Sequence, residues 1–171
     1  YIRLPSKGKY YGPDVFTPTE TGEIPILPMT AKDEMSFQTP DAMMSGQATV
    51  DVIQSCVPAF KNAWQMVNFD TDAVLLAIRI ATYGETMDIT YRVPVTNEEM
   101  SHTVNLPALL EDLARIEIVD EATTPTGFKV KLAPLDYQKL TQVQTAQFEQ
   151  QKIYATVNNS ALSESEKSTQ F

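Results

Sequence analysis

One segment of the 171-residue chain restricts the possible folds more than any other. Across residues 73–81 the only polar side chain is Arg79. Asp70 precedes this run as a potential N-cap and Gly84 follows it as a potential stop, so we predict a helix over residues 71–83. A helix that is apolar on nearly all sides is buried on most of them, and we therefore expect this helix at the centre of the core.

The lone arginine of that helix needs either solvent or a partner. A buried guanidinium extends to the surface along its stem or pairs with a carboxylate. We interpret Arg79 as one half of a structural ion pair, with a contact between subunits as the alternative.

Other helices are expected on the N-terminal side of this one. Thr39-Pro40-Asp41 is typical of a helix start, and Gly46 would end that short helix. A second helix is predicted over residues 47–56, because Val50, Ile53 and Val57 fall on one stripe and Pro58 follows. The loop after it must fold back, since it carries three large apolar side chains that water would not accommodate together: Trp64, Met66 and Phe69.

Residues 1–30 form a different kind of segment. Five prolines and three glycines exclude a helix or a central strand here. The segment is nevertheless too rich in large apolar side chains for a disordered linker. We predict an extended arm that lies across its own domain or reaches a neighbouring subunit. Tyr10, Tyr11 and Phe16 are the candidate partner-binding anchors.

The β-structure is expected after the central helix. Residues 86–93 and 99–106 read as two strands of a hairpin, and Pro107 begins a short helix through Leu113. A third strand is predicted at residues 116–119 and a fourth, half exposed, at residues 128–132, joined by the turn residues 124–127. At the first hairpin's tip, Val93 and Thr96 occupy the positions that cysteines hold in a zinc ribbon. This tip is therefore expected to be knuckle-shaped without metal, and we take Val93 and Thr96 as candidate partner-binding residues.

The last part of the chain is predicted to be helical. Pro134 and Asp136 open a long helix to about Ile153, which carries six glutamines and a narrow apolar face. It is either a solvated helix leaning on the domain or a helix that docks on a partner. A capping box at residues 163–166 predicts a further helix.

Together these patterns predict an α+β fold with a central buried helix and flanking helices. The fold would include a small antiparallel β part, with a zinc-ribbon-like hairpin that lacks metal, and an extended N-terminal arm. The expected division is a Pro-rich arm over residues 1–38, an α+β core over 39–134 with the hairpin at 86–106, and C-terminal helices over 135–171.

Charge and composition exclude several classes of function. The formal charge of −9 opposes binding to nucleic acid or to an anionic membrane, both of which need a basic field. The longest apolar run, residues 73–78, is far shorter than the ~20 residues that span a bilayer. Cys56 is the only cysteine, which fits a reducing compartment.

Chemical motifs are also lacking. The six glycines form no phosphate-binding pattern, and one cysteine and one histidine are too few for a zinc site. A Cys56–His102 dyad is formally possible, but a thiol beside an apolar stripe is usually inert. The adjacent acidic pairs read as solvated surface, and an enzyme with a carboxylate site would need two of them in one pocket, about 5–10 Å apart. We therefore predict no catalytic residues, no cofactor and no metal.

Three stretches resemble the baseplate hub protein family of T-even-type, contractile-tailed bacteriophages. They are Pro28-Met-Thr-Ala-Lys-Asp33, the segment from Gly46-x-Ala48 to Val52-Ile-Gln-Ser-Cys-Val-Pro58, and Leu76-Ala-Ile-Arg-Ile-Ala-Thr-Tyr-Gly84. The likeness continues through the hairpin and Val104-Asn-Leu-Pro-Ala-Leu-Leu110, covers most of residues 2–120, and is most specific in the third stretch. Some members of the family carry cysteines at the hairpin tip, where this chain has Val93 and Thr96.

The resemblance implies a role in building the phage tail baseplate. The chain would be a non-enzymatic hub component of the virion, or an assembly chaperone that escorts hub proteins and leaves. Its partners would be other baseplate and tail proteins in a multi-subunit assembly, put together in the host cytoplasm.

Overall fold

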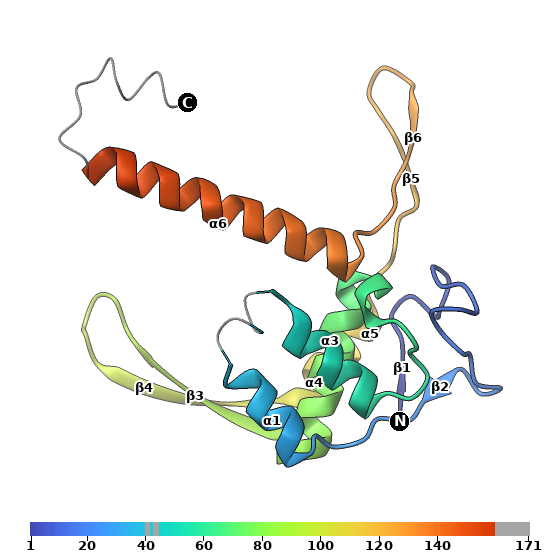
Figure 1. Ribbon diagram of the computed structural model, residues 1–171, viewed down its shortest axis with the longest axis horizontal. Coiled ribbons are helices and arrows are strands. Elements are labelled where there is room, and N and C mark those ends of the chain that lie inside the picture. Colours follow the sequence, from blue (N-terminus) through green and yellow to red (C-terminus); the bar gives the residue numbers. More distant parts are fainter. Residues whose placement is uncertain (40–41, 43–44, 160–171) are drawn as a thin grey trace.

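The structure, a computed structural model, describes residues 1–39, 42 and 45–159 and has an α+β fold (Figure 1). The helices are α1 (Ala31–Phe37), α3 (Gln47–Cys56), a 3-10 turn at Ala63–Gln65, α4 (Asn68–Tyr83), α5 (Leu106–Ala114) and α6 (Tyr137–Asn159). The strands are β1 (Ile2–Arg3), β2 (Glu23–Ile24), β3 (Thr86–Arg92), β4 (Glu99–Asn105), β5 (Glu121–Thr123) and β6 (Lys129–Lys131). They pair in sequence order as three separate antiparallel two-stranded sheets.

The core forms where α3, α4 and the N-terminal arm meet. Positions three and four apart on α4 are buried, as an amphipathic helix requires: Ala73, Val74, Ala77 and Ile78. They pack with the buried stripe of α3, which includes Val50, Ile53 and Cys56 and confirms the helix predicted over residues 47–56. Met66 is fully buried, so the loop between the two helices does fold back.

The central helix differs from its prediction at its N-terminus and on its outer side. It begins at Asn68 with Val67 as the N-cap, so Asp70 lies in the first turn and does not cap the helix. The Val67 carbonyl accepts hydrogen bonds from the backbone amide and the hydroxyl of Thr71. Burial is one-sided, because Leu76 and Ile80 are only half-buried.

Arg79 pairs with an aromatic ring. Its guanidinium lies 4.5 Å from the centroid of the Tyr83 ring, and the Tyr83 hydroxyl donates a hydrogen bond to Glu34. Within the ranges that the structure describes, no carboxylate lies within ion-pair distance of Arg79, so the expected structural ion pair is wrong there. The face of Tyr83 one turn later attracts the cation in its place.

The N-terminal arm lies across its own domain. β1 and β2 pair with each other, and the arm buries Leu4, Val15, Phe16 and Ile24 in the core. The Phe16 ring centroid is 4.9 Å from that of Phe60. Contact of the arm with a neighbouring subunit stays a prediction.

Helix α1 was not predicted from the sequence. Thr30 and Asp33 form a capping box at its start, with the Thr30 hydroxyl accepting from the Asp33 amide and the Asp33 carboxylate accepting from the Thr30 amide. The proline-rich sequence before Thr30 concealed this signal. The helix start expected at Thr39-Pro40-Asp41 lies largely outside the described residues.

The first hairpin and the helix after it are confirmed. β3 and β4 pair over seven residues each, from Thr86↔Asn105 at the base to Arg92↔Glu99 near the tip, and α5 follows with Pro107 in its first turn. The third strand predicted at residues 116–119 is wrong, because β5 is Glu121–Thr123. The turn at residues 124–127 sets the register of this hairpin, with Thr123 opposite Lys129. In this register residues 118 and 119 would lie opposite Pro134 and its neighbour, and Pro134 has no backbone N–H to donate to a partner strand.

Helix α6 begins where its prediction placed it. The Asp136 carboxylate accepts a hydrogen bond from the Lys139 amide at 2.8 Å and caps the first turn. The helix continues to Asn159, beyond the expected end at Ile153. The further helix predicted from residues 163–166 lies outside the described residues.

Candidate protein–protein interface

Three elements leave the core and extend outward: the β3–β4 hairpin, the β5–β6 hairpin and helix α6. We call them the three projections. Figure 1 shows them pointing away from the helices and the arm that form the core. Nearly every residue of the two hairpins is exposed, and so are residues 142–155 of α6. These elements therefore offer most of their surface to other molecules.

The β3–β4 hairpin has two chemically different faces. Residues opposite each other on paired strands share a face, and so do residues two apart on one strand. The register puts Tyr91 opposite Met100 and Ile89 opposite His102. We define the apolar face of the hairpin as Met87, Ile89, Tyr91, Met100, His102 and Val104. The other face is polar, and its cross-strand pair Asp88 and Thr103 forms a side-chain hydrogen bond of 2.6 Å.

The outer half of this apolar face is exposed to solvent. Ile89 is 41% exposed, Tyr91 48% and Met100 49%, whereas Met87 and Val104 near the base are half-buried. A two-stranded hairpin without a packed face is marginally stable in water. An added layer over the apolar face would therefore stabilise the hairpin as well as bind it.

The β5–β6 hairpin is also apolar on one side. Val130 pairs with Ala122, while Lys129 and Lys131 occupy the opposite side. On the apolar side Phe128 is 72% exposed, and Val130 and Leu132 are exposed as well. This hairpin thus presents a second uncovered apolar surface.

A polar contact at its base holds the β5–β6 hairpin against the arm. The Asp120 carboxylate accepts from the Lys9 ammonium and from the Tyr10 hydroxyl, the latter at 2.5 Å. The hydrogen bond from Lys9 holds the pKa of Asp120 below its usual value, with Tyr10 acting in the same direction. The arm therefore fixes where this hairpin leaves the core.

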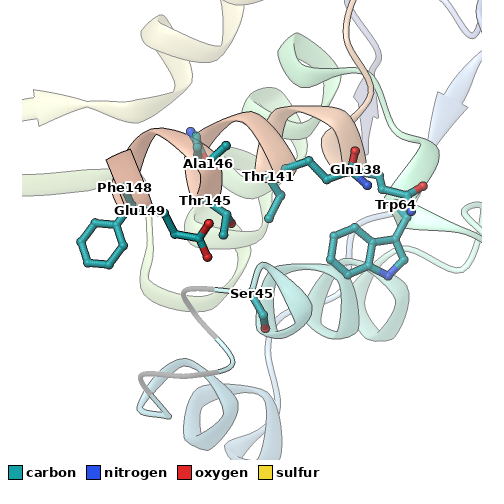
Figure 2. A pocket seen from close by; sticks show the side chains of 10 residues that line it. Ser45, Trp64, Gln138, Thr141, Thr145, Ala146, Phe148 and Glu149 are labelled. Carbon is teal, nitrogen blue, oxygen red and sulfur yellow. The ribbon is translucent and has the colours of Figure 1, made fainter. Parts of the chain in front are cut away.

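Helix α6 contacts the core through its first turns. The Tyr137 amide donates to the Met66 carbonyl at 2.7 Å, and the Tyr137 ring lies 5.8 Å from that of Trp64. Farther along, an open groove of about 860 Å³ separates α6 from Ser45 and Trp64. Figure 2 shows Thr141, Thr145 and Glu149 reaching from α6 toward this groove. The helix therefore crosses the space beside the core without closing on it.

The candidate anchors of the arm lie in intramolecular contacts. Phe16 is buried, and the Tyr11 ring is 5.3 Å from that of Phe60. Tyr10 is half-buried beside Phe69, at 6.3 Å between ring centroids. Their binding of a partner stays a prediction.

The candidate anchors of the hairpin tip lie near the solvent. Val93 is half-buried and Thr96 is exposed, and the Val93 amide donates to the Glu98 carbonyl at 3.0 Å. Their role in binding likewise stays a prediction. Sequence reasoning missed the apolar face below the tip, although the alternation of Met87, Ile89 and Tyr91 was the signal that could have revealed it.

Reactive side chains do not converge in the described part of the chain. Cys56 is buried, which raises the pKa of its thiol to about 11, and the Asp33 charge adds to this effect. His102 is exposed on β4, whereas Cys56 lies in the buried core. The described residues hold no cluster of three or more histidine, cysteine or acidic side chains that would suit a metal.

The buried carboxylate of Asp70 has a structural use, since its partners are Ser6 and Tyr11 of the arm. None of the described helices has the length and hydropathy of a membrane span.

A family model described as T4 bacteriophage base plate protein matches residues 2–166. No curated protein and no solved structure shows a significant similarity to the chain.

Proposed function

The chain belongs to the T4 bacteriophage base plate protein family, and from this premise we propose that it is a non-enzymatic structural component of the tail baseplate hub. It acts through contacts with other baseplate and tail proteins. It binds neither nucleic acid nor membrane, and it enters the baseplate in the host cytoplasm and stays in the virion.

The observation that carries this proposal is the set of three projections. A chain that works alone rarely leaves exposed apolar surface on two hairpins and a long helix. A subunit of a large assembly needs such elements, because each neighbour covers one of them. The exposed Tyr91, Met100 and Phe128 are side chains of the kinds enriched at protein–protein interfaces.

The hub assignment is supported by the residues that resemble hub proteins. The quoted stretches lie in the start of α1, in α3 and in α4, and the likeness continues through the β3–β4 hairpin, so it covers core elements and one of the three projections.

A transient chaperone of the hub is the alternative function. It would use the same exposed surfaces but release its client before the tail is complete. Quantitative mass spectrometry of purified virions and of baseplate intermediates separates the two. We expect a constant ratio of this chain to other baseplate proteins in both preparations.

Two results would count against the proposal. Presence in intermediates with absence from virions would assign the chaperone role. Absence from both would remove the baseplate role altogether.

A further inference from the structure

We propose that the apolar face of the β3–β4 hairpin is the docking site for a basic amphipathic α-helix from another baseplate protein. This inference rests on the proposed function, because the helix must belong to a neighbour in the assembly. It assigns a surface and a chemical class of partner to one of the three projections.

The shape of the hairpin favours a helix as the occupant. The two strands lie ~4.8 Å apart, and with their side chains they present a strip about as wide as one helix, which measures ~10 Å across. Each strand has seven residues and spans about 23 Å, a length that a helix of roughly 15 residues matches. One amphipathic helix laid along the strip would cover Ile89, Tyr91 and Met100 together.

The charge around the apolar face favours a basic partner. By the alternation of faces, Asp88, Arg92 and Glu99 lie on the polar face, whereas Glu85 and Glu98 flank the apolar face at its base and its tip. Residues 85–105 place no lysine or arginine on that side. Lysines or arginines toward the two ends of a helix laid along the apolar face would lie near Glu85 and Glu98. Such rim pairs contribute to orientation and association rate more than to affinity.

The same charges disfavour a second copy of this chain as the occupant. Two hairpins stacked apolar face to apolar face would bring together Glu85 and Glu98 of both copies, on chains that each carry −9. Like charges across an interface suppress association. A different protein that carries an apolar surface and positive charge complements both the apolar side chains and the carboxylates of the hairpin.

The hairpin supplies one contact among several. Its apolar face has six residues, whereas a standard interface uses about 20–30 residues on each side. Most of the binding energy at such a site comes from a few anchors. Tyr91 is the strongest candidate, because it is a large aromatic side chain in the exposed half of the strip.

Site-specific photo-crosslinking in assembled baseplates tests the proposal. A photoreactive phenylalanine analogue is placed at Ile89 or Met100 on the apolar face, and at Thr90 or Ser101 on the polar face as matched controls. Cross-linked peptides are identified by mass spectrometry. We expect products from Ile89 and Met100, but not from the controls, that join this chain to a helical segment of another protein carrying net positive charge.

Several outcomes would overturn the inference. Products that join two copies of this chain, that involve an acidic or extended segment, or that form equally from both faces all contradict it. Incorporation of the chain into baseplates is measured in the same preparations. Incorporation without cross-links overturns the docking site alone, whereas absence of the chain from baseplates overturns the proposed function and the docking site with it.

A competition assay gives an independent measurement. Tyr91→Ser and Thr90→Ser chains each compete with the unaltered chain for incorporation into baseplates, and circular dichroism checks that both fold. Loss of a central aromatic anchor should reduce incorporation of Tyr91→Ser about ten-fold or more, with Thr90→Ser near parity. Equal incorporation of the two variants would contradict a site on the apolar face.

Discussion

At the residue scale, Asp70 connects the N-terminal arm to the central helix. Its carboxylate is fully buried and accepts from the Ser6 amide at 2.9 Å, from the Ser6 hydroxyl and from the Tyr11 hydroxyl at 2.6 Å. The Tyr11 oxygen in turn accepts from the Val67 amide at 3.1 Å. The arm therefore supplies donors to a carboxylate that burial would otherwise leave without partners.

Tyr11→Phe tests this connection. The variant keeps the ring beside Phe60 but removes one donor to Asp70 and leaves the Val67 amide without its partner. We expect a loss of about 1–3 kcal/mol in the free energy of unfolding, measured with urea. Tyr10→Phe is the matched control, since the Tyr10 hydroxyl bonds to the more exposed Asp120. Equal losses in the two variants would contradict the role of the buried network.

Asp70 also predicts a pH dependence. Burial raises the pKa of Asp70 above its ordinary value, against the opposing hydrogen bonds from Ser6 and Tyr11. The unfolded chain then releases this proton at a lower pH than the folded chain, so the Asp70 contribution to stability falls as pH rises from about 4 toward the folded-state pKa. The Asp70→Asn variant lacks this titration. We expect its unfolding free energy, relative to that of the unaltered chain, to increase over that range in urea titrations at successive pH values, and a constant difference would contradict the raised pKa.

At the element scale, the approach of α6 to α3 depends on a glycine. Gly46 has φ +77°, and a Cβ atom there would lie 3.1 Å from the Thr141 hydroxyl and 3.2 Å from the Tyr137 ring. The residue therefore serves two needs, a left-handed conformation before α3 and room for the first turns of α6.

Gly46→Ala should destabilise the protein more than Gly22→Ala. Both glycines have positive φ, but a Cβ at Gly22 would meet nothing within 4 Å. The Gly22 variant measures the conformational cost alone, about 1 kcal/mol, and the Gly46 variant adds the displacement of α6. Thermal unfolding of both variants gives the comparison. Equal melting temperatures would show that α6 can move away from a Cβ at position 46 without loss of stability.

The elements that the sequence predicts well are those with strong local signals. Helix α3 has a clear stripe and a following proline, and α6 has its cap at Asp136. The start of α4 was misplaced because Asp70 resembles a cap, whereas its actual partners are Ser6 and Tyr11, more than 50 residues away in sequence. Only tertiary structure reveals such a use.

Of the three projections, the sequence pointed to the tip of the β3–β4 hairpin and to α6 as possible partner-binding elements, but not to the apolar face. Val93 and Thr96 were identified from the hairpin shape, but the apolar face depends on the pairing of β3 with β4, and the register is set by a turn whose geometry the sequence left open. The arm residues Tyr11 and Phe16 were recognised as apolar anchors. The sequence did not show which surface these side chains cover. In the structure both rings pack against Phe60.

At the scale of the whole molecule, a small core carries elements that add little to its stability. The described side chains of α6 beyond Thr141 are exposed, while Tyr137 packs on Trp64. The core and the outer part of α6 should therefore respond differently to alteration.

Truncation after residue 145 tests this separation. We expect the truncated chain to keep the unfolding free energy of the full chain to within about 0.5 kcal/mol, as is usual for changes at exposed surface. Tyr137→Ala in the full chain should cost about 2 kcal/mol, roughly half the cost of deleting a fully buried aromatic side chain. Urea unfolding compares the three proteins, and a truncated chain less stable than Tyr137→Ala would contradict the separation.

The length of α6 has a mechanical consequence. Its 23 residues span about 34 Å, and the helix is anchored at one end. A rotation of only 10° about that anchor would move the far end by about 6 Å over this length. The contact between Tyr137 and Trp64 therefore sets the direction of α6. A small change in the packing of these two rings would move anything bound at the far end of the helix.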